Sequence, residues 1–201
     1  MMDAIGYRHA AWDTPWWASP NREQGRFHRT LEAPTQYLCL HPLGVAAEFL
    51  RHLGVAVVDD LETINLRLWA AKMELDGLTR IDFDNADDFG ITPEELVGDD
   101  YDPTQALASR LRATGVQGLV APSSALPGTE IVTLFGARTL SPFLFEPIDP
   151  DDQLATAHTA ERSRPADEVV PLVRWFGDAH AGLVEWRATG IAPILFDPIV
   201  V

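Results

Sequence analysis

Polar residues of catalytic types are spread through this sequence rather than grouped in one motif. They include two arginines, a tyrosine at the start of an apolar run, a glutamate just after that run, and a pair of serines behind a proline. These residues are Arg8, Arg26, Tyr37, Glu48 and Ser123, with Ser124 beside the last. Each type also has an ordinary structural explanation, such as a solvated loop arginine, a packed tyrosine or a turn-forming serine. Their spacing alone therefore specifies no reaction.

Familiar catalytic and metal-binding motifs do not occur in the sequence. It contains no Gly-x-Gly-x-x-Gly, Walker loop, His-Glu-x-x-His or Gly-x-Ser-x-Gly pattern. The six histidines lack the spacing of zinc ligands, so we expect no metal site. The single cysteine, Cys39, lies in an apolar run, and we interpret it as a small buried hydrophobic residue rather than a nucleophile.

Two series of short motifs follow one another in a defined order along the chain. The first contains Tyr7-Arg8-His9, Gly25-Arg26-Phe27, Gln36-Tyr37-Leu38 and then Glu48. The second contains Asp99-Asp100-Tyr101, residues 104–108, residues 115–119, Ala121-Pro122-Ser123 and residues 131–135. Each motif is weak by itself, but their order and separation together are specific. Over residues 5–148 the sequence resembles the RES family, which is named for its Arg, Glu and Ser.

This resemblance implies a fold, an activity and a partner. The fold of the family resembles that of ADP-ribosyltransferase toxins, and its members degrade NAD, which is here a substrate. The usual context is a toxin–antitoxin pair, in which an antitoxin with a helix-turn-helix DNA-binding domain covers the active cleft. We therefore expect an antitoxin partner, a homo-oligomer within the toxin–antitoxin complex, and inorganic phosphate as a possible co-substrate.

The resemblance also carries site residues onto this chain, position by position. The catalytic residues fall on Arg8, Tyr37, Glu48 and Ser123, and the NAD-binding residues fall on Arg8, Arg26, Tyr37 and Ser123. Two positions depart from the family pattern, because many members have Asn where this chain has His28 and Glu130. A carboxylate at the second of these positions can alter contacts with the pyrophosphate or the ribose.

The implied chemistry suits these residue types. Cleavage of the nicotinamide–ribose bond passes through an oxocarbenium-like state, as glycoside cleavage does. Glu48 can hydrogen-bond the ribose hydroxyls and favour the growing positive charge. Two arginines can hold the pyrophosphate by forked, charge-assisted bonds. Tyr37 could stack on the nicotinamide ring, and Ser123 could orient the amide or the ribose.

Several functions stay open at this level. The acceptor can be phosphate, water or a protein side chain, which gives phosphorolysis, hydrolysis or ADP-ribosyl transfer. A different class of function is a catalytically weak binding module that occupies a protein partner, with His28 and Glu130 as signs of decay. A glycosidase with a carboxylate pair is disfavoured, since it does not call for two arginines in its site.

Composition narrows the setting. The formal net charge is −15, and the arginines are scattered, so we expect no direct binding of nucleic acid. No stretch approaches the roughly eighteen apolar residues of a membrane span, and the first residues do not have the pattern of a signal peptide. One thiol cannot form an internal disulfide, which fits a reducing compartment. Cytoplasm is therefore the expected location.

Local patterns predict the elements that must position these residues. Strands are predicted at residues 36–40, 55–58, 64–69, 118–121, 131–135 and 143–145. A helix is predicted up to His52 and ends at Gly54, with Leu43, Ala46, Phe49, Leu50 and Leu53 on its apolar face and Glu48 opposite. A second helix runs between Asp102 and Gly115. Residues 7–34 are expected to be irregular, residues 82–102 to form a solvated acidic loop, and residues 168–188 to be helical.

These elements predict an α+β fold that is ADP-ribosyltransferase-like, with strands in two groups and helices packed between and around them. We expect residues 1–148 to form a RES-like NAD-binding catalytic domain. Residues 149–201 are expected to be a linker and a C-terminal extension packed on the same domain, with the linker over residues 146–165.

Overall fold

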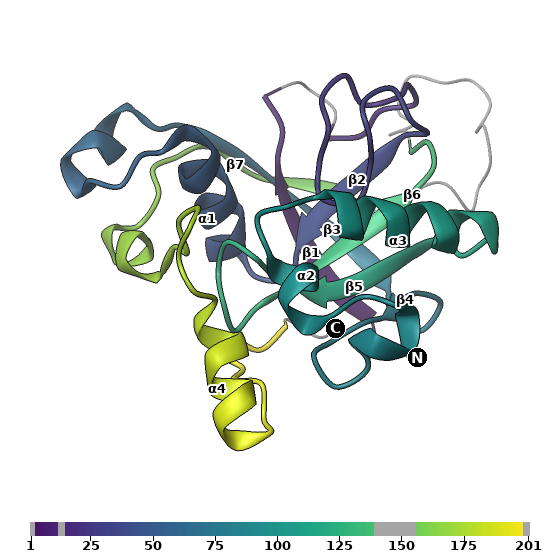
Figure 1. Cartoon of the computed structure of the whole chain (residues 1–201). Coiled ribbons are helices and arrows are strands. Elements are labelled where there is room, and N and C mark those ends of the chain that lie inside the picture. The colour runs from purple at the N-terminus through teal and green to yellow at the C-terminus, as the bar shows by residue number, and fades with distance from the viewer. Residues whose placement is uncertain (1–2, 12–14, 139–155, 199–201) are drawn as a thin grey trace, which may run out of the picture.

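The computed structural model describes residues 3–11, 15–138 and 156–198. Its strands form a seven-stranded sheet in the order β4-β5-β6-β2-β1-β3-β7 (Figure 1). The strands are β1 (Asp3–His9), β2 (Thr35–Cys39), β3 (Leu66–Glu74), β4 (Thr79–Arg80), β5 (Gly118–Pro122), β6 (Glu130–Phe135) and β7 (Thr156–Ser163). Neighbouring strands are antiparallel except for the short parallel pair β4–β5.

The sheet consists of two groups of strands that meet at a narrow junction. Within each group the strands pair over most of their length, as in the seven paired positions of β1 with β3. Between the groups, β1 and β2 pair only where Tyr7 lies opposite Cys39. The α+β class is confirmed, and the two predicted strand groups are joined in one sheet. This junction places the end of β1, with Arg8, beside the end of β2.

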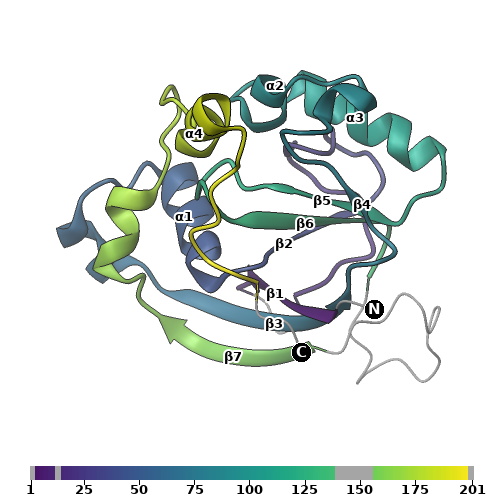
Figure 2. The same cartoon turned by 90° about the horizontal axis from the view of Figure 1, so that it is seen from below.

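In Figure 2 the helices lie above the strands and cover that side of the sheet. They are α1 (Pro42–Leu53), α2 (Pro93–Val97), α3 (Asp102–Ala113) and α4 (Ala181–Thr189), with 3-10 turns η1 (Val58–Thr63), η2 (Ala86–Phe89) and η4 (Asp167–Leu172). The helices α2 and α3 lie over the β5–β6 half, whereas α1 contacts β1, β2 and η4. The acidic stretch 82–102 is therefore not a simple solvated loop, since η2 and α2 form within it.

The helix α1 begins and ends at the residues that its sequence indicates. The His41 ring accepts a hydrogen bond from the Leu43 N–H, and Pro42 occupies the first turn, where its missing N–H costs nothing. Gly54 ends the helix at φ 69°, a left-handed conformation that glycine adopts without strain. The predicted apolar face is wrong at Leu53, which is 55% exposed, because the covered side of α1 is centred on Ala46, Ala47 and Leu50.

Side chains of the sheet and helices form three buried clusters. One packs α2 and α3 against β5 and β6 around Phe27, Leu107 and Leu119. Another joins α1 to η1 and η4 through Leu50, Leu61 and Val169. The third lies on the other face of the sheet and includes Trp16 and Leu38. The segment after residue 160 therefore contributes to the same core as α1.

Two strands were missed by the sequence patterns. Residues 7–9 belong to β1, although the opening was expected to be irregular. A Cβ on Gly6 would lie 2.3 Å from the terminal methyl of Met73, so this glycine, although typical of loops, lies in a closely packed part of a strand. Residues 156–163 form β7 within the expected linker, because the edge of β3 pairs with a polar segment that has no strand pattern of its own.

Two further expectations are corrected. Residues 55–57 lie outside any strand, and a 3-10 turn begins at Val58. The expected helix over residues 168–188 is divided into η4 and α4, with Gly177 at φ 89° between them. Glycine at that position breaks the helical hydrogen-bond ladder. The strand predicted at residues 143–145 lies outside the described residues.

Candidate active site

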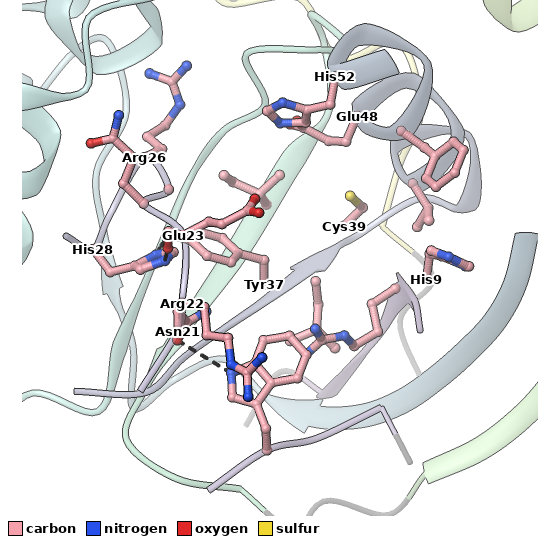
Figure 3. A pocket seen from close by; sticks show the side chains of 18 of the residues that line it. His9, Asn21, Arg22, Glu23, Arg26, His28, Tyr37, Cys39, Glu48 and His52 are labelled. Atoms are coloured by element: carbon pink, nitrogen blue, oxygen red, sulfur yellow. Dashed lines mark hydrogen bonds and ion pairs between the residues drawn. The ribbon is translucent and has the colours of Figure 1, made fainter. Parts of the chain in front are cut away.

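A cavity of about 1100 Å³ opens beside the junction of β1 and β2 (Figure 3). Its walls come from residues 7–9 of β1, the loop from Trp17 to His28, residues 37–39 of β2, the cavity-facing side of α1, and Tyr101. Four of the predicted site residues line it, namely Arg8, Arg26, Tyr37 and Glu48. The structure thus brings together residues that are up to forty positions apart in the sequence.

Arg8 is an almost buried cation in the floor of this cavity. It is 8% exposed, and its Nη1 donates to Gln36 Oε1 at 3.1 Å. Its guanidinium carbon lies 4.1 Å from the centre of the Trp17 ring and 5.3 Å from that of Trp16. Burial lowers the pKa of Arg8 to about 9, so the group is still charged at neutral pH. Among the described residues it forms no ion pair with a carboxylate.

Arg26 presents a second buried charge from the opposite loop. Its Nη1 donates to the Leu96 carbonyl at 3.3 Å, and its guanidinium carbon lies 4.9 Å from the centre of the Tyr101 ring. The second terminal nitrogen, Nη2, is buried and has no hydrogen-bond partner in the described part of the chain. Burial lowers the pKa of Arg26, while Tyr101 and Glu48 act in the other direction. A buried donor without a partner is costly, and an anionic ligand would satisfy it.

Two polar residues of α3 hold the loop that carries Arg26. Thr104 Oγ1 donates to the Arg26 carbonyl at 2.6 Å. Gln105 Nε2 donates to the carbonyls of Gly25 and His28 at 3.0 and 3.1 Å. Both side chains are at most 2% exposed. The sequence analysis named Thr104 and Gln105 only as part of a motif. Two polar residues on an otherwise apolar helix face are the signal that could have predicted their hydrogen bonds to the loop.

Tyr37 is fixed by a chain of hydrogen bonds that includes His28. The His28 Nε2 lies 2.8 Å from the Glu23 carbonyl, so it must carry the proton, and Nδ1 is then an acceptor. The Tyr37 hydroxyl donates to this Nδ1 at 2.7 Å and accepts from the Phe27 N–H at 2.9 Å. Burial lowers the pKa of His28, which favours this neutral form. At this departure from the family pattern, the histidine therefore orients Tyr37.

Glu48 projects from α1 into the same cavity and keeps partial access to solvent. Its side chain is 30% exposed, and one carboxylate oxygen lies 3.6 Å from His52 Nε2, one turn further along the helix. Since α1 is anchored by Leu50 on its buried side, Glu48 is held on the cavity side of the helix. A carboxylate thus faces two buried guanidinium groups across one cavity.

Ser123 is the one predicted site residue that does not line the cavity. It is fully buried, and its Oγ accepts the Leu126 N–H at 3.1 Å within the turn after β5. Ser124 beside it is also buried, and its Oγ finds no hydrogen-bond partner among the residues described. Glu130, the second departure from the family pattern, forms an ion pair with Arg80 at the start of β6 and does not itself line the cavity.

Neither metal ligands nor membrane-spanning elements stand out in the described part of the chain. Residues 3–11, 15–138 and 156–198 contain no group of three or more His, Cys, Asp or Glu side chains placed to hold a metal ion. No helix within those ranges has the length and apolar character needed to cross a membrane.

Comparison with known proteins adds the family. The model of the RES domain matches residues 4–160. The chain belongs to the RES family. The resemblance predicted over residues 5–148 is thereby confirmed and extends into β7.

Two individual proteins resemble the chain. A protein of Mycobacterium tuberculosis named "Probable NAD(+) phosphorylase" is 33% identical over 118 residues, which cover 59% of this chain and 56% of the relative. The chain thus matches little more than half the length of this curated relative. The crystal structure of the M. tuberculosis MbcT–MbcA toxin–antitoxin complex contains a chain that matches with a TM-score of 0.56 and 19% identity, covering 86% of this chain and 89% of that one. This likeness shows a shared fold.

Proposed function

We propose that this protein cleaves the nicotinamide–ribose bond of NAD. The observation that carries the proposal is the pair of buried arginines, Arg8 and Arg26, that face Glu48 across one cavity and form no ion pair of their own within the described ranges. In a protein of net charge −15, two such cations are a strong local preference for an anionic ligand. The named activity of the M. tuberculosis relative supports NAD as that ligand.

The cavity has the size and the groups that a dinucleotide requires. Its volume of about 1100 Å³ is slightly above the roughly 300–1,000 Å³ that is usual for small-molecule sites. Charge-assisted bonds from Arg8 and Arg26 can hold the two pyrophosphate charges. The oriented ring of Tyr37 offers a surface for the nicotinamide. Ser123 stays in this proposal as the hydroxyl that the family resemblance predicts.

Glu48 is the residue proposed to stabilise the reacting sugar. The bond between C1′ of the ribose and the ring nitrogen of nicotinamide breaks, and its electron pair neutralises the pyridinium nitrogen. The positive charge that develops on the ribose is stabilised by a carboxylate nearby. Nicotinamide leaves as a neutral molecule, so no strong general acid is needed on that side.

Phosphate is the acceptor that we propose. An oxygen of hydrogen phosphate forms the new bond to C1′, which gives nicotinamide and an ADP-ribose that carries a phosphate at that carbon. Hydrogen phosphate is already an anion and can attack without a general base. Attack by water, in contrast, requires a general base to remove a proton. The name of the relative favours this acceptor over water or a protein side chain. We also propose that the fold is ADP-ribosyltransferase-like.

Release of nicotinamide from NAD tests the proposal. Purified protein is incubated with NAD, with and without inorganic phosphate, and products are followed by chromatography and phosphorus NMR. As a control we choose Arg187→Ala, which removes an exposed ion pair of Arg187 on α4 with Glu94. We expect nicotinamide from both the wild type and this control, a phosphate-dependent rate, and a new phosphate ester. Nicotinamide without that ester would indicate hydrolysis. If the folded wild type did not cleave NAD, the proposed enzymatic activity would be wrong, and the alternative of a binding module that occupies a protein partner would replace it.

We also propose that the chain acts as a toxin held inactive by an antitoxin. Uninhibited cleavage of NAD would damage the cell that makes the protein. The structural neighbour also comes from a toxin–antitoxin complex. The helix-turn-helix character of the partner, the homo-oligomeric assembly, the cytoplasmic location and the division at residue 148 belong to this proposal. Expression of the chain alone should arrest growth and lower cellular NAD, and the neighbouring gene product should reverse both. Unchanged NAD and growth would contradict the toxin assignment.

A further inference from the structure

An ion-pair network with two buried arginines connects the cavity to the C-terminal segment, which lies beyond the matched RES domain. At its centre is Asp99, whose Oδ1 lies 2.5 Å from Arg51 Nη2 and 2.9 Å from Arg174 Nη1. The Gly177 N–H donates to Asp99 Oδ2 at 2.7 Å. Burial opposes ionisation of Asp99, but Gly177 and the two arginines outweigh it and lower its pKa. One carboxylate thus holds two cations from distant parts of the chain.

Arg51 is the member of this network that lines the cavity. It lies on α1, three residues after Glu48, and is 2% exposed. The ring of Phe176, from the C-terminal segment, lies 4.1 Å from its guanidinium carbon. The Nε of Arg51 is buried and has no hydrogen-bond partner in residues 3–11, 15–138 and 156–198. A third cation is therefore present in the wall of the cavity, and it is held by Asp99 from inside the family match and by Phe176 from outside it.

Arg174 connects the network to two other parts of the fold. It is 8% exposed, and its Nη1 also donates to the Val97 carbonyl at 3.1 Å and approaches the Ser124 carbonyl at 3.5 Å. Its backbone N–H donates to the Ala125 carbonyl at 2.9 Å. These bonds connect the C-terminal segment to the end of α2 and to the turn after β5.

His180 adds a further contact to the same turn. Its Nε2 donates to the Ser123 carbonyl at 3.0 Å, and its Nδ1 accepts the Leu183 N–H at 3.1 Å, which begins α4. Together with Arg174, it places hydrogen-bond donors on three consecutive carbonyls of the turn that carries the predicted site serine. The views in Figures 1 and 2 show this segment beside α1 and α2.

We infer that Asp99 and Arg174 are positioning residues that hold Arg51 in place to bind a phosphate group of the substrates, and that the C-terminal segment is thereby part of the active site. This inference rests on the proposed NAD cleavage. A guanidinium fixed by a shared carboxylate and an aromatic ring loses little freedom on binding, which favours recognition of a phosphoryl oxygen. The phosphate group can be the NAD pyrophosphate or the inorganic co-substrate.

Substrate kinetics of network variants distinguish these two sources. In Arg174→Met we expect an apparent KM about tenfold above the wild type with kcat within about twofold, the pattern of lost ground-state binding. A rise in the KM for NAD alone indicates the pyrophosphate, and a rise in the KM for inorganic phosphate alone indicates the co-substrate. Arg174→Lys, which keeps a cation beside Asp99, should recover part of the loss.

Matched controls separate positioning from general stability. Arg187 on α4 forms an exposed ion pair with Glu94, so Arg187→Ala removes a surface contact of the same segment. It should leave both KM values unchanged. In the double variant Arg51→Met/Arg174→Met, the second substitution should add less than twofold to the effect of the first, because both act through one cation.

Two results would overturn the inference. One is a folded Arg174→Met protein with both KM values within about twofold of the wild type. The other is an equal change in Arg187→Ala. Should Arg174→Met be unfolded by circular dichroism, Asp99→Asn is measured in its place, and failure of both to fold would assign the network a purely structural role. A wild type that releases no nicotinamide fails the proposed function instead, and the two failures are thus distinguishable.

Discussion

Two pairs of buried arginines in this protein differ in how their charges are compensated. The first pair, Arg8 and Arg26, has no carboxylate partner among the described residues and faces the cavity from β1 and from the loop before β2. The second pair, Arg51 and Arg174, shares the carboxylate of Asp99 at 2.5 and 2.9 Å. Burial of a cation is costly in both cases, but within the described fold only the second pair recovers part of that cost from a carboxylate.

This difference predicts that the two pairs contribute differently to stability. A cation that stays uncompensated after folding gains its partner when an anionic ligand arrives, so its contribution is to affinity. A cation that shares a carboxylate also contributes to stability, because its removal leaves that carboxylate with one partner fewer. The first pair is therefore expected to affect substrate binding without a loss of stability, and the second pair to affect both.

The largest effect is expected at the residue that faces the first pair. Glu48→Gln keeps the size of the side chain and removes its charge, so the growing positive charge on the ribose loses its nearest carboxylate. We expect the fold to be intact and kcat to fall about a hundredfold. The rate of nicotinamide release at saturating NAD measures this kcat directly. Full activity in a folded variant would remove Glu48 from the reaction.

The next effect sharpens the role of the uncompensated pair. In Arg26→Ala we expect an apparent KM for NAD about thirtyfold above the wild type, since a buried pyrophosphate loses a charged donor. In Arg26→Lys the KM should fall only partway back, because an ammonium group cannot make the forked contact. Initial rates over a range of NAD concentrations test both variants. A Lys variant that equals the wild type would indicate a generic charge at this position.

Stability measurements compare the two pairs by the sign of the change. Arg174→Leu leaves Asp99 with one of its two cations, whereas Arg26→Leu removes a charge that no carboxylate of the described residues compensates. We expect the free energy of unfolding in urea to be about 2 kcal/mol lower for Arg174→Leu than for Arg26→Leu. Equal values for the two variants would break the comparison.

The smallest effect concerns acid. Burial lowers the pKa of His180 to about 4, against about 6.5 for an unfolded histidine. The unfolded chain therefore binds the proton first, and the stability that neutral His180 provides above pH 6.5 is lost as the pH falls toward 4. We expect a loss of about 1 kcal/mol between pH 7.5 and 5.5.

A matched variant isolates the histidine from the other groups that titrate in this range. His180→Asn keeps an oxygen that can cap α4 but has no group that titrates there. Its stability should depend less on pH by the same amount. If the wild type and this variant lose stability equally on acidification, His180 is not the group responsible.

Local patterns predicted those parts of the fold that are encoded by neighbouring residues. The end of α1 at Gly54 and the apolar strands β2, β5 and β6 were recognisable in this way, and α3 ends at Ala113, two residues before the predicted Gly115. The strands β1 and β7 were not, because β1 is formed by pairing with the distant strand β3, and β7 depends on the other edge of β3. Both depend on contacts between distant segments.

The site divides along the same line. Arg8, Arg26, Tyr37 and Glu48 were singled out by family resemblance, and their gathering around one cavity follows from the fold rather than from their spacing. Arg51 was missed because a cation in the last turn of a helix is ordinarily explained by the helix dipole. Arg174 lies in a segment outside the family motifs, and only the position of Asp99 connects it to the cavity.

A crystal structure of the Glu48→Gln variant with NAD tests the central claim most directly, since this variant should bind the substrate without consuming it. The account predicts the pyrophosphate within hydrogen-bond distance of Arg26 Nη2 and the nicotinamide ring against Tyr37, with the Arg51–Asp99–Arg174 network unchanged. NAD bound outside this cavity, or a pyrophosphate held by neither Arg8 nor Arg26, would contradict it.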